Sequence, residues 1–384
     1  RAGSVPRYGW AASTLSDGID LVCVSALGPG DIYAAGTVPA TPHRGRVCHF
    51  DGRSWAAMRD TPGRRLTAVA ALDSSHVWAA GEAGMMLFYD GVSWAEQPLP
   101  SPGTVNSLSA LDPSHVWAVG EGGRVYFFDG TRWSVATPLP GRTLESVFAL
   151  DSEHVWAAGA RGTVLAWDGR AWLDRSAGGP GTLRGVSALD ADCVWAVGDG
   201  GTVKYYDGRS WADFRAGVSG ALRGVAALDS EHVFAASDSG GVCYWDGAAW
   251  KVAGTGVSSP IRSVAALDTD HVYACGDAGV FLHGYSMLEA RNTAFYFAEG
   301  SCRPEFDPYI CIQNPHPTAA ARVRITYMCG NGATTEQTLS VPGSSRATVA
   351  VKEKLGSGDD AAHDFSAKVE CTNGVAVIAE RPMY

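Results

Sequence analysis

A 39-residue period constrains this chain more than any other feature of its sequence. The period is marked by HVWAAG from His76, HVWAVG from His115, HVWAAG from His154 and CVWAVG from Cys193, with diverged copies from Asp31, His232 and His271. A unit of this length that contains several short apolar runs buries its faces only by stacking on its neighbours. The chain is therefore expected to be a repeat protein with seven copies of one unit.

Each unit is predicted to form four strands. The second unit shows an apolar strand over 66–72, a turn, a strand over 76–81, a Gly-rich turn, a strand over 85–89 and a last strand from Trp94. Four such strands make a propeller blade, and blades stack face to face around an axis. The last copy lacks a tryptophan strand, whereas Tyr8-Gly9-Trp10 precedes the first. The prediction is an all-β fold with a seven-bladed β-propeller over residues 1–284, in which the N-terminal strand completes the last blade.

The periodicity stops after residue 284, and residues 285–292 are predicted to be a linker. Residues 293–384 contain short alternating runs, which favour strands. These runs are 295–298, 309–313, 323–327, 337–341, 347–351, 366–370 and 375–380. Seven short strands in a module of this size predict an immunoglobulin-like β-sandwich.

Residues 8–284 resemble the bacterial secreted propellers related to the WD-repeat, kelch and Asp-box families. The phrases FYFAEG, IQNP, ITYM and AERPMY resemble a C-terminal module of secreted actinobacterial-type proteins, a resemblance that implies no activity. Asp90 and Trp94 are four positions apart, whereas the Asp-box spacing is five, which disfavours a sialidase. The chain begins at Arg1 without a Met, so we expect a secreted protein that acts outside the cell or at the cell surface.

The composition excludes two classes of partner. The formal charge of −10 provides no basic face for nucleic acid. No apolar run approaches the roughly 18 residues that cross a bilayer, so no membrane span is expected.

The nine cysteines are interpreted by position. Cys302 and Cys311 flank a segment with two prolines, which suggests a disulfide, and Cys329 and Cys371 are candidates for another. In the repeat register, Cys23 and Cys48 fall on non-adjacent strands about 9.5 Å apart. This distance is too long for a disulfide, so buried thiols are predicted.

Polar residues recur at two turns of the repeat. The turn histidines lie one per unit around a ring, so they do not converge on a metal. Hydrogen bonds to aspartates of the same turns are favoured instead. The pairs are His76 with Asp73, His115 with Asp112, His154 with Asp151, His232 with Asp229 and His271 with Asp268. Acidic residues follow the second strand as Glu82, Glu121, Asp199, Asp238 and Asp277. One carboxylate per turn does not suit calcium, so turn chemistry is favoured, although such a ring attracts a basic partner. No metal and no cofactor are predicted.

Arg184, Arg223 and Arg262 recur at the start of the innermost strand of three successive units. Sialidases hold a carboxylate with three arginines, so the cluster is a candidate anion site. The alternative is structural, with a salt bridge between Arg184 and Glu145 of the preceding unit.

The first unit carries a six-residue insertion within TVPATPHRGR, residues 37–46. Loops that depart from a regular scaffold often carry contacts, so Thr37, Pro39, His43 and Arg44 are the candidate partner surface. The recurring tryptophans are predicted to pack between blades.

No catalytic motif or zinc-type spacing is present in the sequence, and the predicted protein is not an enzyme. The favoured function is a non-catalytic extracellular structural or adhesive protein, a homo-oligomer or polymer that self-assembles into a filament, tube or surface layer. The alternatives are a lectin-like propeller that binds cell-surface glycans and, less favoured, a sialidase-type glycoside hydrolase.

Overall fold

The structure is a computed structural model that describes residues 7–15, 17–287, 294–314, 319–373, 375 and 377–380. The chain divides into two compact units, one spanning Tyr8–Ser286 and the other containing the described residues from Met287 onward, with which Arg7 is also grouped. Strand β28 (Val280–Met287) runs three residues into the predicted linker, of which residues 288–292 lie outside the described part. No described helix is long and apolar enough to cross a membrane.

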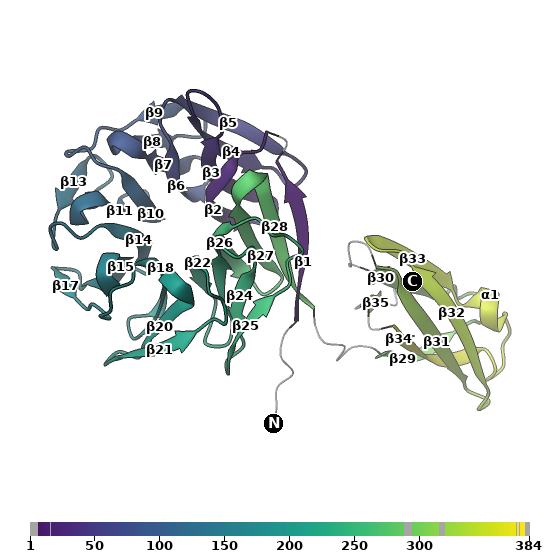
Figure 1. Cartoon of the computed structure of the whole chain (residues 1–384). Helices are drawn as coiled ribbons and strands as arrows, with labels where there is room; N and C mark the ends of the chain where they lie inside the picture. Colours follow the sequence, from purple (N-terminus) through teal and green to yellow (C-terminus); the bar gives the residue numbers. More distant parts are fainter. Residues whose placement is uncertain are drawn as a thin grey trace. The chain divides into compact units, whose positions relative to one another are not determined.

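The first unit consists of four-stranded antiparallel sheets arranged radially around an axis (Figure 1), and seven of them lie within residues 7–287 as described. The innermost strands are β2 (Asp20–Gly28), β6 (Leu66–Asp73), β10 (Val105–Asp112), β14 (Leu144–Ala149), β18 (Leu183–Asp190), β22 (Leu222–Ala227) and β26 (Ile261–Asp268). The second strands are β3 (Asp31–Val38), β7 (His76–Gly81), β11 (His115–Gly120), β15 (Val155–Gly159), β19 (Cys193–Gly198), β23 (Val233–Ser237) and β27 (His271–Gly276).

The outer strands complete each sheet. The third strands are β4 (Arg44–Phe50), β8 (Met86–Tyr89), β12 (Val125–Phe128), β16 (Thr163–Trp167), β20 (Thr202–Tyr206), β24 (Val242–Trp245) and β28. The outermost strands are β5 (Trp55–Pro62), β9 (Trp94–Glu96), β13 (Trp133–Ala136), β17 (Trp172–Asp174), β21 (Trp211–Arg215), β25 (Trp250–Ala253) and β1 (Arg7–Thr14). Short 3-10 turns follow second strands as η1 (Glu82–Gly84), η2 (Glu121–Gly123), η3 (Ala160–Gly162), η4 (Asp199–Gly201) and η5 (Asp277–Gly279).

The ring of sheets closes through the N-terminal strand. Strand β1 pairs with β28 in the sheet that also contains β27 and β26, which confirms the predicted completion of the last repeat. Each innermost strand contacts the next one, and β26 contacts β2. The arrangement is that of a β-propeller.

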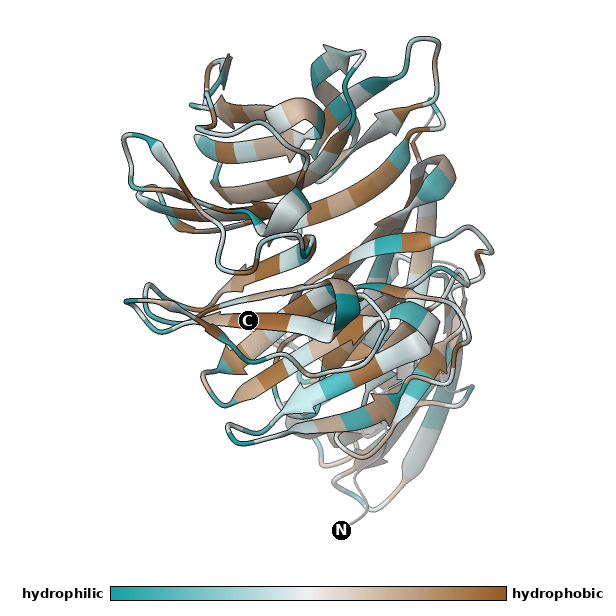
Figure 2. Ribbon diagram, turned by 60° about the vertical axis from the view of Figure 1, so that its left-hand side comes forward, coloured by the Kyte–Doolittle hydropathy of each residue, from teal (hydrophilic) through white to brown (hydrophobic). Residues whose placement is uncertain are grey.

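Aromatic side chains fill the space between neighbouring sheets. Trp78 is 1% exposed, and its ring lies 5.0 Å from that of Phe88 in its own sheet and 6.4 Å from that of Phe128 in the next. Trp133 is also buried, and its Nε1 donates a hydrogen bond of 2.7 Å to Gln97 of the preceding sheet. The recurring tryptophans therefore pack between sheets, as predicted. Figure 2 shows that the hydrophobic residues lie mainly on the strands and the hydrophilic ones at the turns.

Aspartates shape the two polar turns of the repeat. In the Asp-Gly turn, Asp90 Oδ1 accepts hydrogen bonds from the backbone N–H groups of Val92 and Ser93, at 2.8 and 2.7 Å, while Gly91 has a φ of 90° that favours glycine. The predicted histidine–aspartate hydrogen bonds are confirmed. Their Nδ1–O distances are 3.0 Å for His76, 2.8 Å for His115, 2.9 Å for His154, 2.8 Å for His232 and 2.9 Å for His271.

The second unit consists of two antiparallel sheets around one apolar core. One sheet has the order β29 (Ala294–Ser301), β34 (Asp364–Cys371), β31 (Ala321–Cys329), β32 (Thr334–Val341), and the other β33 (Ser345–Ala350), β30 (Tyr309–Asn314), β35 (Ile378–Glu380). A short helix, α1 (Lys352–Leu355), follows β33. Ile310 and Ile312 of one sheet share the core with Ile325, Tyr327 and Val369 of the other. Each predicted run of this module thus contributes a strand.

The structure contradicts the predicted disulfides, because all nine cysteines are free thiols. Cys371 lies opposite Val323 in the β31–β34 pair, whereas Cys329 lies opposite Phe365. Six residues along a strand correspond to about 20 Å, far beyond the reach of a disulfide.

Cys302 and Cys311, the other predicted pair, lie on opposite sides of a sheet. Cys302 lies in the core, where burial raises its pKa to about 11, whereas Cys311 lies on the opposite side of β30, 3.8 Å from Thr348 Oγ1. In the first unit, Cys23 and Cys48 are free thiols on β2 and β4, as predicted, although only Cys48 is buried and Cys23 is partly exposed.

The closure of the ring predicts a stability effect at Tyr8. Its ring lies 4.8 Å from that of Phe234 and 5.2 Å from that of Tyr244 in the neighbouring sheet, and its hydroxyl has no hydrogen-bond partner among the described residues. Tyr8→Ala is expected to lower the free energy of unfolding by about 3 kcal/mol, as for other buried aromatic truncations. Tyr8→Phe keeps the ring and removes an unsatisfied hydroxyl, so it should not destabilise. Denaturant unfolding measures both, and equal losses would contradict this role of the ring.

The polar turns predict a loss of stability in acid. Hydrogen bonds from Ser75 and His76 lower the pKa of Asp73 from 3.8 to about 2, and hydrogen bonds from Thr131 and Arg132 lower that of Asp129 to about 2. A carboxyl group with a depressed pKa in the folded state stabilises it above the unfolded pKa and loses this contribution as the pH falls through the folded value. Thermal unfolding should therefore show stability decreasing from about pH 4 to pH 2. Asp73→Asn should make this decrease in stability smaller. An unchanged dependence of stability on pH would contradict the contribution of the Asp73 turn.

Candidate functional site

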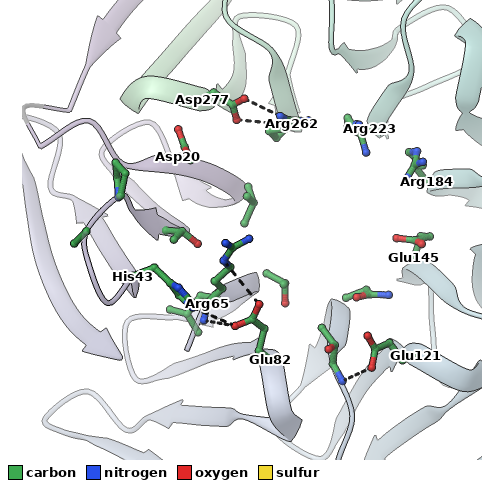
Figure 3. Close-up of a pocket in the computed structure, with 18 of the residues that line it drawn as sticks. Asp20, His43, Arg65, Glu82, Glu121, Glu145, Arg184, Arg223, Arg262 and Asp277 are labelled. Carbon is green, nitrogen blue, oxygen red and sulfur yellow. Dashed lines mark hydrogen bonds and ion pairs between the residues drawn. The ribbon is translucent and has the colours of Figure 1, made fainter. Parts of the chain in front are cut away.

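One cavity of the propeller, here called the axial pocket, lies at one end of the ring axis and has a volume of about 990 Å³. Its wall contains the same repeat position from all seven innermost strands, namely Val22, Thr67, Asn106, Glu145, Arg184, Arg223 and Arg262. Because these strands converge on the axis, residues one repeat apart become neighbours there. Figure 3 shows Arg184, Arg223 and Arg262 along one arc of the pocket and Glu145, Glu121 and Glu82 along the adjoining arc.

The three predicted arginines therefore meet in one pocket, but each is bound by an aspartate fifteen residues later in the chain. Arg184 Nε lies 2.6 Å from Asp199. Arg223 donates from Nε and Nη2 to Asp238, at 2.9 and 2.7 Å.

The third arginine is the most fully engaged of the three. Arg262 binds Asp277 through Nε and Nη2, at 2.9 and 2.7 Å, and its Nη1 donates to Asp238 at 3.0 Å. These hydrogen bonds raise the pKa of Arg262. The positive charge of the cluster is thus balanced within the protein by Asp199, Asp238 and Asp277, which disfavours binding of an anion.

The predicted salt bridge between Arg184 and Glu145 is not the arrangement found, since Arg184 pairs with Asp199. The reason is the hairpin register: Leu183 pairs with Gly198, so Asp199 lies beside Arg184, whereas the position fifteen residues after Glu145 is Ala160, which offers Glu145 no charged partner. Glu145 forms no ion pair with a described residue, and burial raises its pKa, although Arg184 and Arg223 act in the opposite direction. The structure therefore places a half-buried carboxyl group in the pocket wall without a bound counter-ion.

Other carboxyl groups of the pocket are held by backbone donors. Asp20 Oδ1 accepts a hydrogen bond of 3.0 Å from the N–H of Ala278, and Glu121 Oε2 accepts one of 3.2 Å from Thr104. Neither forms an ion pair with another described residue. Glu82 lies 3.8 Å from Arg65 Nε and 3.6 Å from His43 Nε2. The acidic ring thus has the predicted turn role. In addition, Asp20, Glu121 and Glu145 form no ion pair with a described residue, so the pocket has more carboxyl groups than its arginines balance.

The insertion in the first repeat reaches the same pocket. It lengthens the β3–β4 hairpin, in which Val38 pairs with Arg44, and replaces the 3-10 turn of other repeats. The tip of the hairpin brings Thr37, Pro39 and His43 into the wall of the axial pocket. Arg44 does not line it, because Arg44 turns toward Asp60, 3.4 Å away. All predicted partner residues except Arg44 therefore converge on one cavity.

The turn histidines are dispersed and engaged with aspartates, as described above. Among the described residues no group of three or more His, Cys, Asp and Glu side chains is placed to hold a metal ion. What the axial pocket offers chemically is a set of carboxylates preorganised by backbone hydrogen bonds, which suits a cationic group.

The signal that the sequence analysis missed is the arginine–aspartate spacing. Arginine at the start of an innermost strand and aspartate after the second strand recur together three times at the same separation of fifteen residues. In an antiparallel hairpin these positions are neighbours, as the pairing of Leu183 with Gly198 shows. The repeated spacing of arginine and aspartate therefore predicts the three ion pairs.

Solved structures with the same architecture are β-propellers. A structure described as "YCF48 bound to D1 peptide" has a TM-score of 0.60 and 18% identity, over 74% of this chain and 100% of that one. YCF48 from Cyanidioschyzon merolae has a TM-score of 0.57 and 19% identity, over 72% and 98%. The WD40 propeller domain of Doa1 has a TM-score of 0.58 and 14% identity, over 73% and 97%.

These likenesses and the sheet layout define the first unit as a β-propeller of WD40 type, and at this level of identity they show the fold alone. No protein-family model matches the sequence, and no curated protein matches it.

The electrostatics of the pocket predict a shift in the titration of Glu145. Arg184→Ala removes a positive charge that lowers the pKa of this carboxyl group, so the pKa should rise further above its ordinary value. The chemical shift of the Glu145 carboxyl carbon, followed by NMR as the pH is varied, reports it. Arg215→Ala removes an arginine that does not line the pocket and should leave the titration unchanged. A lower pKa in Arg184→Ala would contradict the assignment.

Proposed function

We propose that this chain is a seven-bladed β-propeller joined to an immunoglobulin-like module, and that it is a non-catalytic adhesive or structural protein acting outside the cell. In this proposal the axial pocket holds a cationic segment of a partner polypeptide, with lysine or arginine side chains among the carboxylates. The observation that carries it is the presence of unpaired carboxylates at Asp20, Glu121 and Glu145 beside arginines already bound by aspartates.

The size and shape of the pocket support a polypeptide ligand. Its volume of about 990 Å³ lies at the upper end of ordinary ligand pockets. One structural neighbour is described as bound to a peptide, which is consistent with this use of the fold but concerns that protein. The tip of the β3–β4 hairpin adds Thr37, Pro39 and His43 to a wall that all seven innermost strands provide.

The same contacts argue against a sialidase-type hydrolase. Such a site requires guanidinium groups that are free to hold the carboxylate of a substrate, whereas Arg223 directs two nitrogens and Arg262 three to aspartates. The self-assembly into a filament, tube or surface layer, and the glycan-binding alternative, stay predictions from the sequence.

The test is binding of short peptides that differ only in charge. A fluorescently labelled lysine-containing peptide should bind, and its affinity should fall as salt is added, whereas the matched glutamate peptide should not bind. Glu121→Gln should weaken binding on the order of tenfold, the equivalent of about 1.4 kcal/mol. Fluorescence anisotropy measures all of these.

Glu153→Gln is the matched control, because Glu153 is an exposed acidic residue in a turn and does not line the pocket. Equal binding of both peptides, or the same loss in Glu153→Gln as in Glu121→Gln, would overturn the proposal. Preferential binding of the glutamate peptide would assign the site to the arginines instead.

A further inference from the structure

A second cavity lies between two neighbouring sheets, away from the axis. It has a volume of about 370 Å³ and lies between the sheet of β10–β13 and that of β14–β17. Its wall is aromatic, with Trp117, Phe127, Trp167 and Trp172, and Ala136 lies at its mouth as an exposed residue. We call it the inter-sheet pocket.

The repeat shows what is missing from this pocket. Two repeat periods later the corresponding residues are Trp195, Trp245 and Phe214, the last in place of Ala136. Ala136 pairs with Val125 on β12, and Phe214 pairs with Val203 on β20, so the two positions match in register. The Phe214 ring lies 5.9 Å from that of Trp195 and 5.4 Å from that of Trp245. The protein itself therefore shows that a phenyl ring fits between the two tryptophans at this position.

A hydrogen-bond donor is also available at the inter-sheet pocket. Trp94 Nε1 and Trp250 Nε1 have no hydrogen-bond partner among the described residues. Two other equivalent indole groups, however, donate to the residue that follows the outermost strand of the preceding sheet: Trp133 Nε1 to Gln97 at 2.7 Å, and Trp211 Nε1 to the carbonyl of Arg175 at 2.8 Å. Both acceptors occupy the repeat position of Ala136. Trp172 Nε1 forms no hydrogen bond with a described residue, and Trp172 is only partly buried.

Three of the remaining polar groups of the wall are already engaged, whereas Ser152 Oγ and His115 Nε2 form no hydrogen bond with another described residue. Ser134 Oγ donates to the carbonyl of Phe127 at 3.2 Å, Trp167 Nε1 donates to the carbonyl of Ser152 at 3.2 Å, and His115 Nδ1 is bound to its aspartate. A sugar needs several partners for its hydroxyl groups, whereas an aromatic ring needs apolar faces and edges. The wall therefore fits an aromatic ring better than a sugar.

We propose that the inter-sheet pocket binds an aromatic side chain of a partner polypeptide, which takes the place that Phe214 takes two repeats later. A carbonyl oxygen of the partner accepts the hydrogen bond of Trp172 Nε1, as the carbonyl of Arg175 does for Trp211. The inference does not depend on the axial pocket, because it concerns other residues and an uncharged ligand.

The test uses N-acetyl-phenylalanine amide, which is neutral, with the full chain. Saturable binding at one site is expected, followed by tryptophan fluorescence and by isothermal titration calorimetry. Ala136→Phe should fill the pocket with the chain's own ring and weaken binding more than tenfold. Phe214→Ala should open an equivalent pocket and raise the stoichiometry from one to two.

Circular dichroism checks that both variants are folded, and Phe214→Ala still tests the proposal if Ala136→Phe is not. N-acetyl-leucine amide and methyl β-glucoside are the comparison probes, and weaker binding of both is expected. The proposal is overturned if the phenylalanine amide does not bind, if Ala136→Phe binds it as the unmodified chain does, if Phe214→Ala adds no site, or if the glucoside binds more tightly.

Discussion

Hydrogen bonds from the backbone of one innermost strand to serine side chains of the preceding sheet tie the propeller together at its axis. Innermost strands are sheet edges, so their outward N–H groups need acceptors. The serine oxygens supply them, with distances of 3.1 Å from Ala71 N to Ser25, 3.2 Å from Val147 N to Ser107, 3.2 Å from Val186 N to Ser146, 3.1 Å from Ala227 N to Ser187 and 3.3 Å from Val24 N to Ser263. The last of these joins the final repeat to the first. The wall of the axial pocket is rigid because these strands are held in register with each other.

On this rigid frame, a repeat position has different roles in different sheets. At the start of the innermost strand, Asn106 donates from Nδ2 to the carbonyl of Leu144 and links two sheets, whereas Arg223 binds an aspartate of its own sheet. Glu145 has neither type of partner. At the outer edge, the repeat position that holds Phe214 in one sheet holds Ala136 in another. A cavity is present at Ala136, although the backbone register of the two sheets is the same. The inter-sheet pocket therefore arises from a side-chain substitution in a constant scaffold, whereas the axial pocket combines such substitutions with the inserted β3–β4 hairpin.

Most of the strand arrangement was predictable from the period, because each repeat must form the same hairpins. The strands from 66 to 96, the His76–Asp73 turn and the pairing of β1 with the last sheet all agree with that prediction. The Cys329–Cys371 disulfide was a wrong prediction, since proximity in a sandwich depends on strand register, which the alternation of apolar residues does not define.

The candidate site was predictable only in part. The sequence alone identified Arg184, Arg223 and Arg262 and the inserted hairpin as irregularities, but assigned them to separate roles. Only the hairpin geometry shows that the arginines and the inserted hairpin line one pocket. The same geometry shows that aspartates neutralise the arginines. The exclusion of Arg44 from the pocket likewise depends on its ion pair with Asp60.

The sequence by itself determined the all-β architecture, the position of the turns and the tryptophan packing, because these depend on contacts within one repeat and between adjacent repeats. The tertiary structure alone decided which side chains meet at the axis and which cavity stays open between sheets. The physical reason is that side chains several repeats apart, and those of the first and last repeats, meet only when the sheets close into a ring. The charge and volume of the enclosed space then depend on all the repeats together.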